Sequence, residues 1–130
     1  MFPEVLHVAT IVLTDDNRDL LEVFKMLLES LNYIVRAFQD PVQALSSIRQ
    51  EKCDLVMTDL HMPTMNGLEL KERIEDECCA VPVLIMSNDL ERPPTILNKM
   101  DLINPEVLAQ TINHELVRGG GNEKTNSHRR

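Results

Sequence analysis

Acidic side chains stand at the ends of two apolar runs in this sequence. Asp15 and Asp16 follow the run at residues 7–13, and Asp59 follows the run at residues 53–58. Carboxylates that converge in one crevice repel one another unless a cation lies between them. Oxygen ligands of this kind suit a hard octahedral ion that keeps several waters, so Mg²⁺ is the expected ion.

Two further polar residues close the later apolar runs. Ser87 carries a hydroxyl at the end of the fourth run, and Lys99 carries an ammonium group after the fifth. A carboxylate held against Mg²⁺ can attack phosphorus, because the metal reduces the repulsion between two anions and stabilises the charge of the transition state. Ser87 and Lys99 stand where donors to the phosphoryl oxygens would be needed.

The elements that must position these residues follow from the hydrophobic pattern. Apolar, β-branched runs alternate with segments of helical period, which predicts an α/β fold with a parallel sheet. We expect five strands, at residues 7–13, 33–38, 53–58, 81–86 and 95–98, the last of them short. Helix starts are indicated after Asp15-Asp16-Asn17, at Asp40-Pro41, after the loop at residues 61–67 and at Asn104-Pro105, where caps or first-turn prolines occur.

Right-handed crossovers decide where the carboxylates lie. They place the first and third strands side by side in a doubly wound sheet of order 2-1-3-4-5. Ligands bind such sheets at the carboxyl edge, where the strand order reverses. Asp15, Asp16 and Asp59 are therefore expected to share one crevice at that edge.

The connection between the fourth and fifth strands is short. It spans the seven residues 88–94 and includes Pro93 and Pro94. A helical crossover needs at least about 10–12 residues. Either the chain returns without a helix, or the fifth strand is not parallel to the fourth. An extended return can reach, because seven residues span up to ~24 Å and a strand of five or six residues only ~17–20 Å.

Composition limits the classes of partner. The 130 residues suit one domain, and the formal net charge of −8 repels nucleic-acid backbones and anionic membranes. The start has no basic n-region, and no run approaches the ~20 apolar residues of a membrane span. We expect a soluble cytoplasmic protein with no direct nucleic-acid partner. Its cysteines (Cys53, Cys78 and Cys79) form no metal or disulfide pattern and are expected to be reduced thiols.

The domain is expected to cover residues 1–118. Residues 119–130 contain no apolar side chain that could anchor them to a core. Such a composition is typical of a disordered polar tail or a linker.

The combined pattern resembles the receiver (CheY-like) domains of response regulators in two-component signalling. The resemblance rests on the Asp pair after the first strand, the segment 58–67 (TDLHMPTMNG) and Ser87 closing the fourth strand, and it covers roughly residues 7–117. It implies the flavodoxin-like receiver fold. It also implies that Asp59 accepts a phosphoryl group and that Asp15 and Asp16 hold Mg²⁺, directly or through water.

The same resemblance assigns roles to the neighbouring residues. The main-chain carbonyl of His61 would be a further metal ligand beside Asp59, and the His61 side chain an exposed loop residue. Ser87 would be the switch hydroxyl and Lys99 the phosphate-binding lysine. Pro63 and Gly67 would shape the loop after the acceptor.

Three residues depart from the family pattern. Met100 follows Lys99 where proline is usual, Asn88 replaces a small residue, and Ile96 stands where an aromatic switch residue is expected. These departures affect the usual route by which phosphorylation reaches the surface around the fourth helix and fifth strand.

Three functional hypotheses are compatible with these residues. The first is a phosphorelay receiver, loaded by a histidine kinase or phosphotransfer protein, that hydrolyses its own acyl phosphate slowly and acts through a downstream protein or by self-dimerisation rather than as an enzyme. The second is a degenerate receiver that binds partners without phosphorylation. The third, a haloacid-dehalogenase-type hydrolase, is disfavoured because that class needs Asp two residues after the nucleophile, where this chain has His61.

Overall fold

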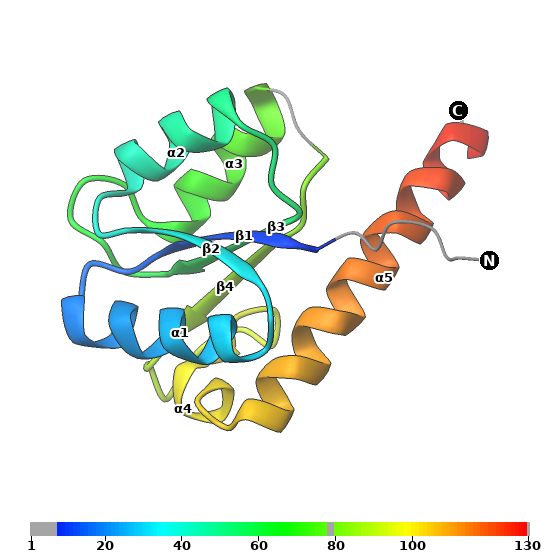
Figure 1. Cartoon of the computed structure of the whole chain (residues 1–130). Coiled ribbons are helices and arrows are strands. Elements are labelled where there is room, and N and C mark those ends of the chain that lie inside the picture. The colour runs from blue at the N-terminus through cyan, green and yellow to red at the C-terminus, as the bar shows by residue number, and fades with distance from the viewer. Residues whose placement is uncertain (1–7, 78–79, 130) are drawn as a thin grey trace.

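A five-stranded parallel sheet forms the centre of the structure (Figure 1). The computed structural model describes the backbone of residues 8–77 and 80–129, and the side chains of these residues up to Arg118. The strands are β1 (Thr10–Thr14), β2 (Ile34–Phe38), β3 (Leu55–Asp59), β4 (Val83–Ser87) and β5 (Leu97–Asn98). Their order is β2-β1-β3-β4-β5 and every pairing is parallel. The predicted fold class and strand order are confirmed.

Five helices accompany the sheet: α1 (Arg18–Ser30), α2 (Pro41–Gln50), α3 (Gly67–Glu77), α4 (Lys99–Leu102) and α5 (Pro105–Arg129). The predicted caps are formed. The side chain of Asn17 accepts a hydrogen bond from the main chain of Leu20 at the start of α1, and Asp40 accepts one from Val42 at the start of α2. These side-chain acceptors satisfy N–H groups that have no partner within the helix.

Two apolar layers hold the helices on the sheet. Along β1, Ile11 and Leu13 belong to the layer beneath α1 and α5, whereas Val12 belongs to the layer beneath α2 and α3. This division follows from the two-residue period of a strand, which sends alternate side chains to opposite faces. Figure 1 shows the same arrangement, with α2 and α3 on one face of the sheet and α1 on the other.

The connection from β4 to β5 contains no helix. Residues 88–96 run as turns and irregular chain, and β5 nevertheless lies parallel to β4. The first of the two alternatives is therefore correct, and the predicted absence of this helix is confirmed. The short helix α4 follows β5 instead and is not predicted by the sequence pattern. Its cap is Asn98, whose side chain accepts a hydrogen bond from Met100 N.

Several boundaries differ from the expected ones. β1 begins at Thr10, where the N–H donates to the carboxylate of Asp54 at 2.7 Å, and residues 1–7 lie outside the described residues.

Cys53 is a half-buried free thiol whose pKa is raised by burial. Cys78 and Cys79 also lie outside the described residues.

The backbone of α5 is helical to Arg129, beyond the domain end expected at residue 118. In Figure 1 the last turns of α5 extend beyond the sheet. The sequence of residues 119–129 has no apolar side chain to bury there, so the division at residue 118 and the disordered tail stay predictions.

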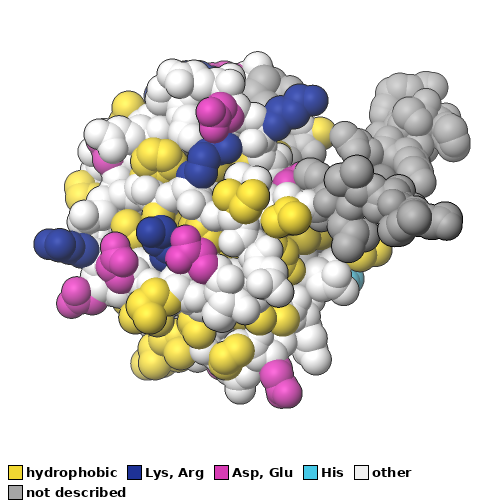
Figure 2. Space-filling model, in the orientation of Figure 1, with side chains coloured by type: hydrophobic (Ala, Val, Ile, Leu, Met, Phe, Trp, Pro, Cys, Tyr) yellow, Lys and Arg dark blue, Asp and Glu magenta, His cyan; other side chains and the backbone are white. Residues whose placement is uncertain are grey.

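The surface in Figure 2 carries charges of both signs. Acidic and basic side chains are interspersed on this face, and hydrophobic side chains gather over α1 and α4, where Val23, Met26 and Met100 are exposed. No continuous basic surface is present on this face. Among the described residues, no helix has the length and apolar character needed to cross a membrane.

Replacement of Gly67 by alanine should destabilise the fold. A Cβ at Gly67 would lie 2.6 Å from the carbonyl oxygen of Asp59, so the main chain of β3 or α3 has to move. We expect Gly67→Ala to lower the free energy of unfolding by about 1–3 kcal/mol, as overpacking does. Glu72→Ala, an exposed position on the same helix, should change it by less than about 0.5 kcal/mol. Urea denaturation measures both, and equal stability of the two variants would contradict the close approach.

Candidate functional site

The turn after β1 places two carboxylates. Asp15 is fully buried, its N–H donates to Phe38 O at 3.2 Å, and its Oδ1 accepts from Asn17 N at 2.9 Å. These contacts fix the direction of the Asp15 side chain. Asp16, the next residue, is exposed.

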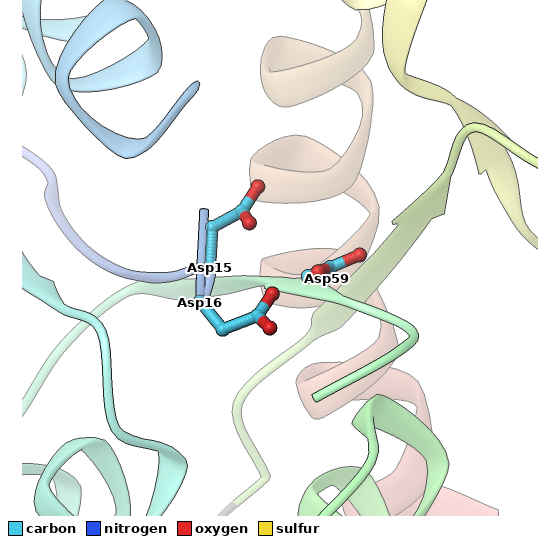
Figure 3. Close-up of side chains that lie close together, drawn as sticks. All are labelled: Asp15, Asp16 and Asp59. Carbon is cyan, nitrogen blue, oxygen red and sulfur yellow. The ribbon is translucent and has the colours of Figure 1, made fainter. Parts of the chain in front are cut away.

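The third carboxylate ends β3. Every residue of this strand is buried, and Asp59 is 6% exposed. The main chain just beyond it is held by the bond from Leu60 N to Met86 O at 2.8 Å. One carboxylate oxygen from each of Asp15, Asp16 and Asp59 lies within 4.8 Å of the other two. Figure 3 shows the three side chains converging from the ends of β1 and β3.

Lys99 joins the cluster from the first residue of α4. Its ammonium lies 2.8 Å from Asp15 Oδ2 and 3.1 Å from Asp59 Oδ1, and the residue is 4% exposed. The short connection after β4 thus does not remove Lys99 from the crevice. The Asn98 cap and the parallel β5 bring it there, which the sequence alone left open.

Electrostatics in the crevice are strongly coupled. Burial and the negative charge of Asp15 raise the pKa of Asp59 to about 6, although Lys99 opposes the shift. Burial alone would lower the pKa of Lys99, but the ion pairs with the carboxylates of Asp15 and Asp59 outweigh it and raise this pKa. With a pKa of about 6, the Asp59 carboxyl group is mostly ionised at neutral pH, and the Lys99 ammonium beside it balances part of the negative charge.

The donor set fits a hard divalent cation. Asp15 Oδ2 is buried and, in the described part of the chain, makes no well-directed hydrogen bond, although the Lys99 ammonium lies beside it. With Asp16 and Asp59 it offers an all-oxygen site, the type that Mg²⁺ takes in proteins. Whether the main-chain carbonyl of His61 joins this set stays a prediction.

Ser87 closes β4 beside the cluster. It is fully buried, and the β3–β4 register pairs Asp59 with Met86, so Ser87 stands one residue beyond the level at which β3 ends. Its Oγ accepts a hydrogen bond from Asp89 N at 2.9 Å.

The loop after Asp59 is shaped by buried methionines and a capping box. Met62 and Met65 are buried, and Pro63 is exposed. Asn66 and Glu69 exchange hydrogen bonds, each side chain accepting from the other's main chain. This reciprocal pair fixes the start of α3. The tight approach at Gly67 is consistent with its expected role in shaping the loop.

Comparison with known proteins agrees with this geometry. A family model described as the response regulator receiver domain matches residues 11–113. The chain belongs to the response regulator receiver domain family. The matched range runs from β1 to the first turns of α5.

Two curated relatives illustrate the sequence similarity. The receiver domain is 39% identical over 84 residues to a putative two-component response regulator, ARR21, of Arabidopsis thaliana, covering 63% of this chain and 14% of that protein. It is 36% identical over 78 residues to the response regulator GtcR of Aneurinibacillus migulanus, covering 60% and 32%. The chain thus spans well under half the length of these relatives.

Solved structures show the same fold. A CheY-like receiver domain protein of Methanospirillum hungatei matches with a TM-score of 0.79 at 20% identity, covering 89% of this chain and 99% of that one. The signal receiver domain of an HD domain-containing protein from Pseudomonas fluorescens matches with a TM-score of 0.81 at 22% identity, covering 95% and 97%.

One contact at the site of the receiver domain is missed by sequence reasoning. The ring of His61 lies 2.6 Å from Asp89 Oδ2, and Asp89 in turn donates its N–H to Ser87. The hydrogen bond to Asp89 raises the pKa of His61 and lowers that of Asp89. No local pattern could reveal this pair, because its members stand 28 residues apart. The exposed position of His61, at 66%, is as expected.

Removing the charge of Asp59 should stabilise the metal-free domain. Because the folded-state pKa of about 6 exceeds the ordinary value of 3.8, folding disfavours the ionised carboxylate, and this group's contribution to stability falls as the pH rises from about 4 to 6. In EDTA at pH 7, Asp59→Asn should be more stable than the unaltered protein by about 1–3 kcal/mol.

The pH series tests the cause of this difference. The gap between the two proteins should narrow as the pH falls from about 6 toward about 3, because Asp59 is then protonated in both the folded and unfolded states. Urea denaturation at several pH values measures it. A gap that stays constant with pH would contradict the electrostatic explanation.

Proposed function

We propose that this receiver domain accepts a phosphoryl group on Asp59 from a histidine kinase or phosphotransfer protein. The observation that carries the proposal is the meeting of Asp59 with Asp15, Asp16 and Lys99 in one crevice. The Mg²⁺ site would consist of the three carboxylates and the main-chain carbonyl of His61. The membership in the receiver family supports the phosphorelay role.

The residues suit an in-line transfer to a carboxylate. An Asp59 oxygen forms the bond to phosphorus while the bond from phosphorus to the donor's phosphohistidine nitrogen breaks, and the proton the nitrogen needs comes from the donor or solvent. Bound Mg²⁺ would neutralise charge on the phosphoryl oxygens. The Lys99 ammonium and the Ser87 hydroxyl would donate hydrogen bonds to those oxygens. The proposal is supported by the 3.1 Å distance from Lys99 Nζ to Asp59 Oδ1 and by the burial of Ser87 at the end of β4.

The domain would act as a switch rather than as an enzyme on a separate substrate. Its chemistry would be limited to accepting the phosphoryl group and hydrolysing the acyl phosphate slowly. Output would pass through contact with a downstream protein or a second copy in the cytoplasm. The formal charge of −8 argues against direct nucleic-acid or anionic-membrane partners.

A degenerate receiver that works without phosphorylation is the second candidate. It is favoured by the missing crossover helix and by Ile96, which is 5% exposed and stands in place of an aromatic switch residue. A buried aliphatic side chain cannot change exposure in the way a hinged aromatic ring does. Phosphoryl labelling of Asp59 separates the two candidates.

Mg²⁺ should stabilise the fold. A ligand that binds only the native state raises the free energy of unfolding with its concentration, so millimolar Mg²⁺ should raise the melting temperature. Asp16→Ala should abolish this response. Asp19→Ala, which removes an exposed carboxylate outside the cluster, should retain it. An unaltered protein whose melting temperature ignores Mg²⁺ would contradict the metal site.

Asp59 should be the only phosphorylated residue. After incubation with acetyl phosphate and Mg²⁺, intact-mass spectrometry should show the addition of one phosphoryl group to the unaltered protein and none to Asp59→Asn. Asp76→Asn, an exposed position on α3, should label normally. Labelling that persists without Asp59 would refute the assignment. A folded, Mg²⁺-responsive protein that takes no label would favour the degenerate receiver.

A further inference from the structure

Two side chains meet just beyond the carboxyl edge of the sheet. The ring of His61 lies 2.6 Å from Asp89 Oδ2, and because an ionised carboxylate only accepts, the ring N–H donates this hydrogen bond. His61 follows the end of β3, and Asp89 follows the end of β4. These strands are neighbours in the sheet, so the His61–Asp89 pair joins the two segments that leave its carboxyl edge.

The pair lies next to the proposed phosphorylation site. Asp59 is the last residue of β3 and Ser87 the last of β4, and both are buried. The pKa of His61 is raised first by the hydrogen bond to Asp89. The charges of Asp59 and Lys99 also act on this pKa, in opposite directions, so the ring is within electrostatic reach of both groups. The pair therefore stands on the outer side of Asp59, where the main chain leaves the sheet.

Asp89 is held in place through its own main chain. Its N–H donates to Ser87 Oγ at 2.9 Å, and its carbonyl oxygen accepts from Arg92 Nη1 at 2.8 Å. The side chains of His61 and Asp89 are 66% and 48% exposed, and such exposed pairs contribute little to stability. Loss of the pair is therefore expected to leave the fold intact.

Both reactions at Asp59 use the line that leads outward from its carboxylate. In hydrolysis of the acyl phosphate, a water oxygen bonds to phosphorus and the bond from phosphorus to the Asp59 oxygen breaks. The electron pair of that bond returns to the carboxylate, and inorganic phosphate and one solvent proton are released. The attacking and leaving oxygens lie roughly in line, so the water approaches from the side opposite Asp59. When acetyl phosphate loads Asp59, acetate departs along the same line.

We propose that the His61–Asp89 pair controls access along this line, so that Asp59 is loaded and hydrolysed only while the pair is open. The inference rests on the proposed phosphoryl acceptance by Asp59 and names the residues that set the lifetime of the product. Both are positioning residues, since neither bonds to the phosphoryl group. A single open fraction multiplies the rates of both reactions, so loading and hydrolysis change by the same factor when the pair is removed.

Obstruction differs from direct participation in the sign of its effect. A side chain that took the proton of the attacking water would be a general base, and its removal would slow hydrolysis. Removal of an obstructing pair makes hydrolysis faster. The 2.6 Å contact favours obstruction, because no water fits between the ring nitrogen and the carboxylate oxygen while the pair is closed.

The test uses the full chain loaded with acetyl phosphate and Mg²⁺. Desalting removes the donor, and intact-mass spectrometry then follows the loss of the phosphoryl group with time. His61→Ala and Asp89→Ala should each lose it about two- to fivefold faster, the range that an exposed ion pair can supply. Loading by acetyl phosphate should become faster by the same factor. The double variant should match the single variants, because both changes open the same contact.

Matched variants separate this role from a structural one. His61→Gln keeps a side-chain donor for Asp89 and should restore slow loss of the phosphoryl group. Glu91→Gln, an exposed position on the same segment, should leave both rates unchanged. The substitutions at position 61 retain the main-chain carbonyl there, so the melting temperature and its response to Mg²⁺ should not change.

The outcomes distinguish the inference from the proposed function. Unchanged or slower hydrolysis in both alanine variants would overturn the inference, and so would faster hydrolysis without faster loading. Either result leaves phosphoryl acceptance by Asp59 intact. An unaltered chain that takes no label contradicts the proposed function and the inference with it.

Discussion

Repulsion among three carboxylates at one edge of the sheet is the constraint on which the rest of this structure depends. Parallel strands bring Asp15, Asp16 and Asp59 together whether or not their charges are compatible. Lys99 offsets part of the repulsion, whereas burial and then the charge of Asp15 raise the pKa of Asp59. A cation between the carboxylates would relieve the repulsion, which is why the cluster suits the proposed metal site.

Rigid elements surround this unfavourable cluster. Asp59 ends a strand whose residues are all buried, and the following loop is fixed by the Asn66–Glu69 capping box and the close approach of Gly67. Charges that repel would move apart on a flexible scaffold. The packing of the sheet between two apolar layers prevents this, so stability from the core maintains the geometry of the site.

The short return after β4 has two consequences at opposite ends of the strand. At the carboxyl edge, Lys99 still reaches the crevice. The two paired residues of β5 and the Asn98 cap are sufficient to position the start of α4, where Lys99 lies. Toward the other end, β5 pairs only with Met86 and Ser87 of β4. Asp89, on the segment after β4, contacts His61 and donates its N–H to Ser87, which connects this segment to the loop after Asp59.

Much of this could be predicted from the sequence, because periodicity, caps and strand-end residues are local signals. The α/β class, the strand order, the convergence of Asp15, Asp16 and Asp59 and the absence of a helix before β5 all follow from such signals together with crossover handedness. The ion pairs of Lys99, the helix α4 and the His61–Asp89 contact do not follow from local signals. Each depends on how residues far apart in the chain pack in three dimensions, and only the tertiary structure decides that.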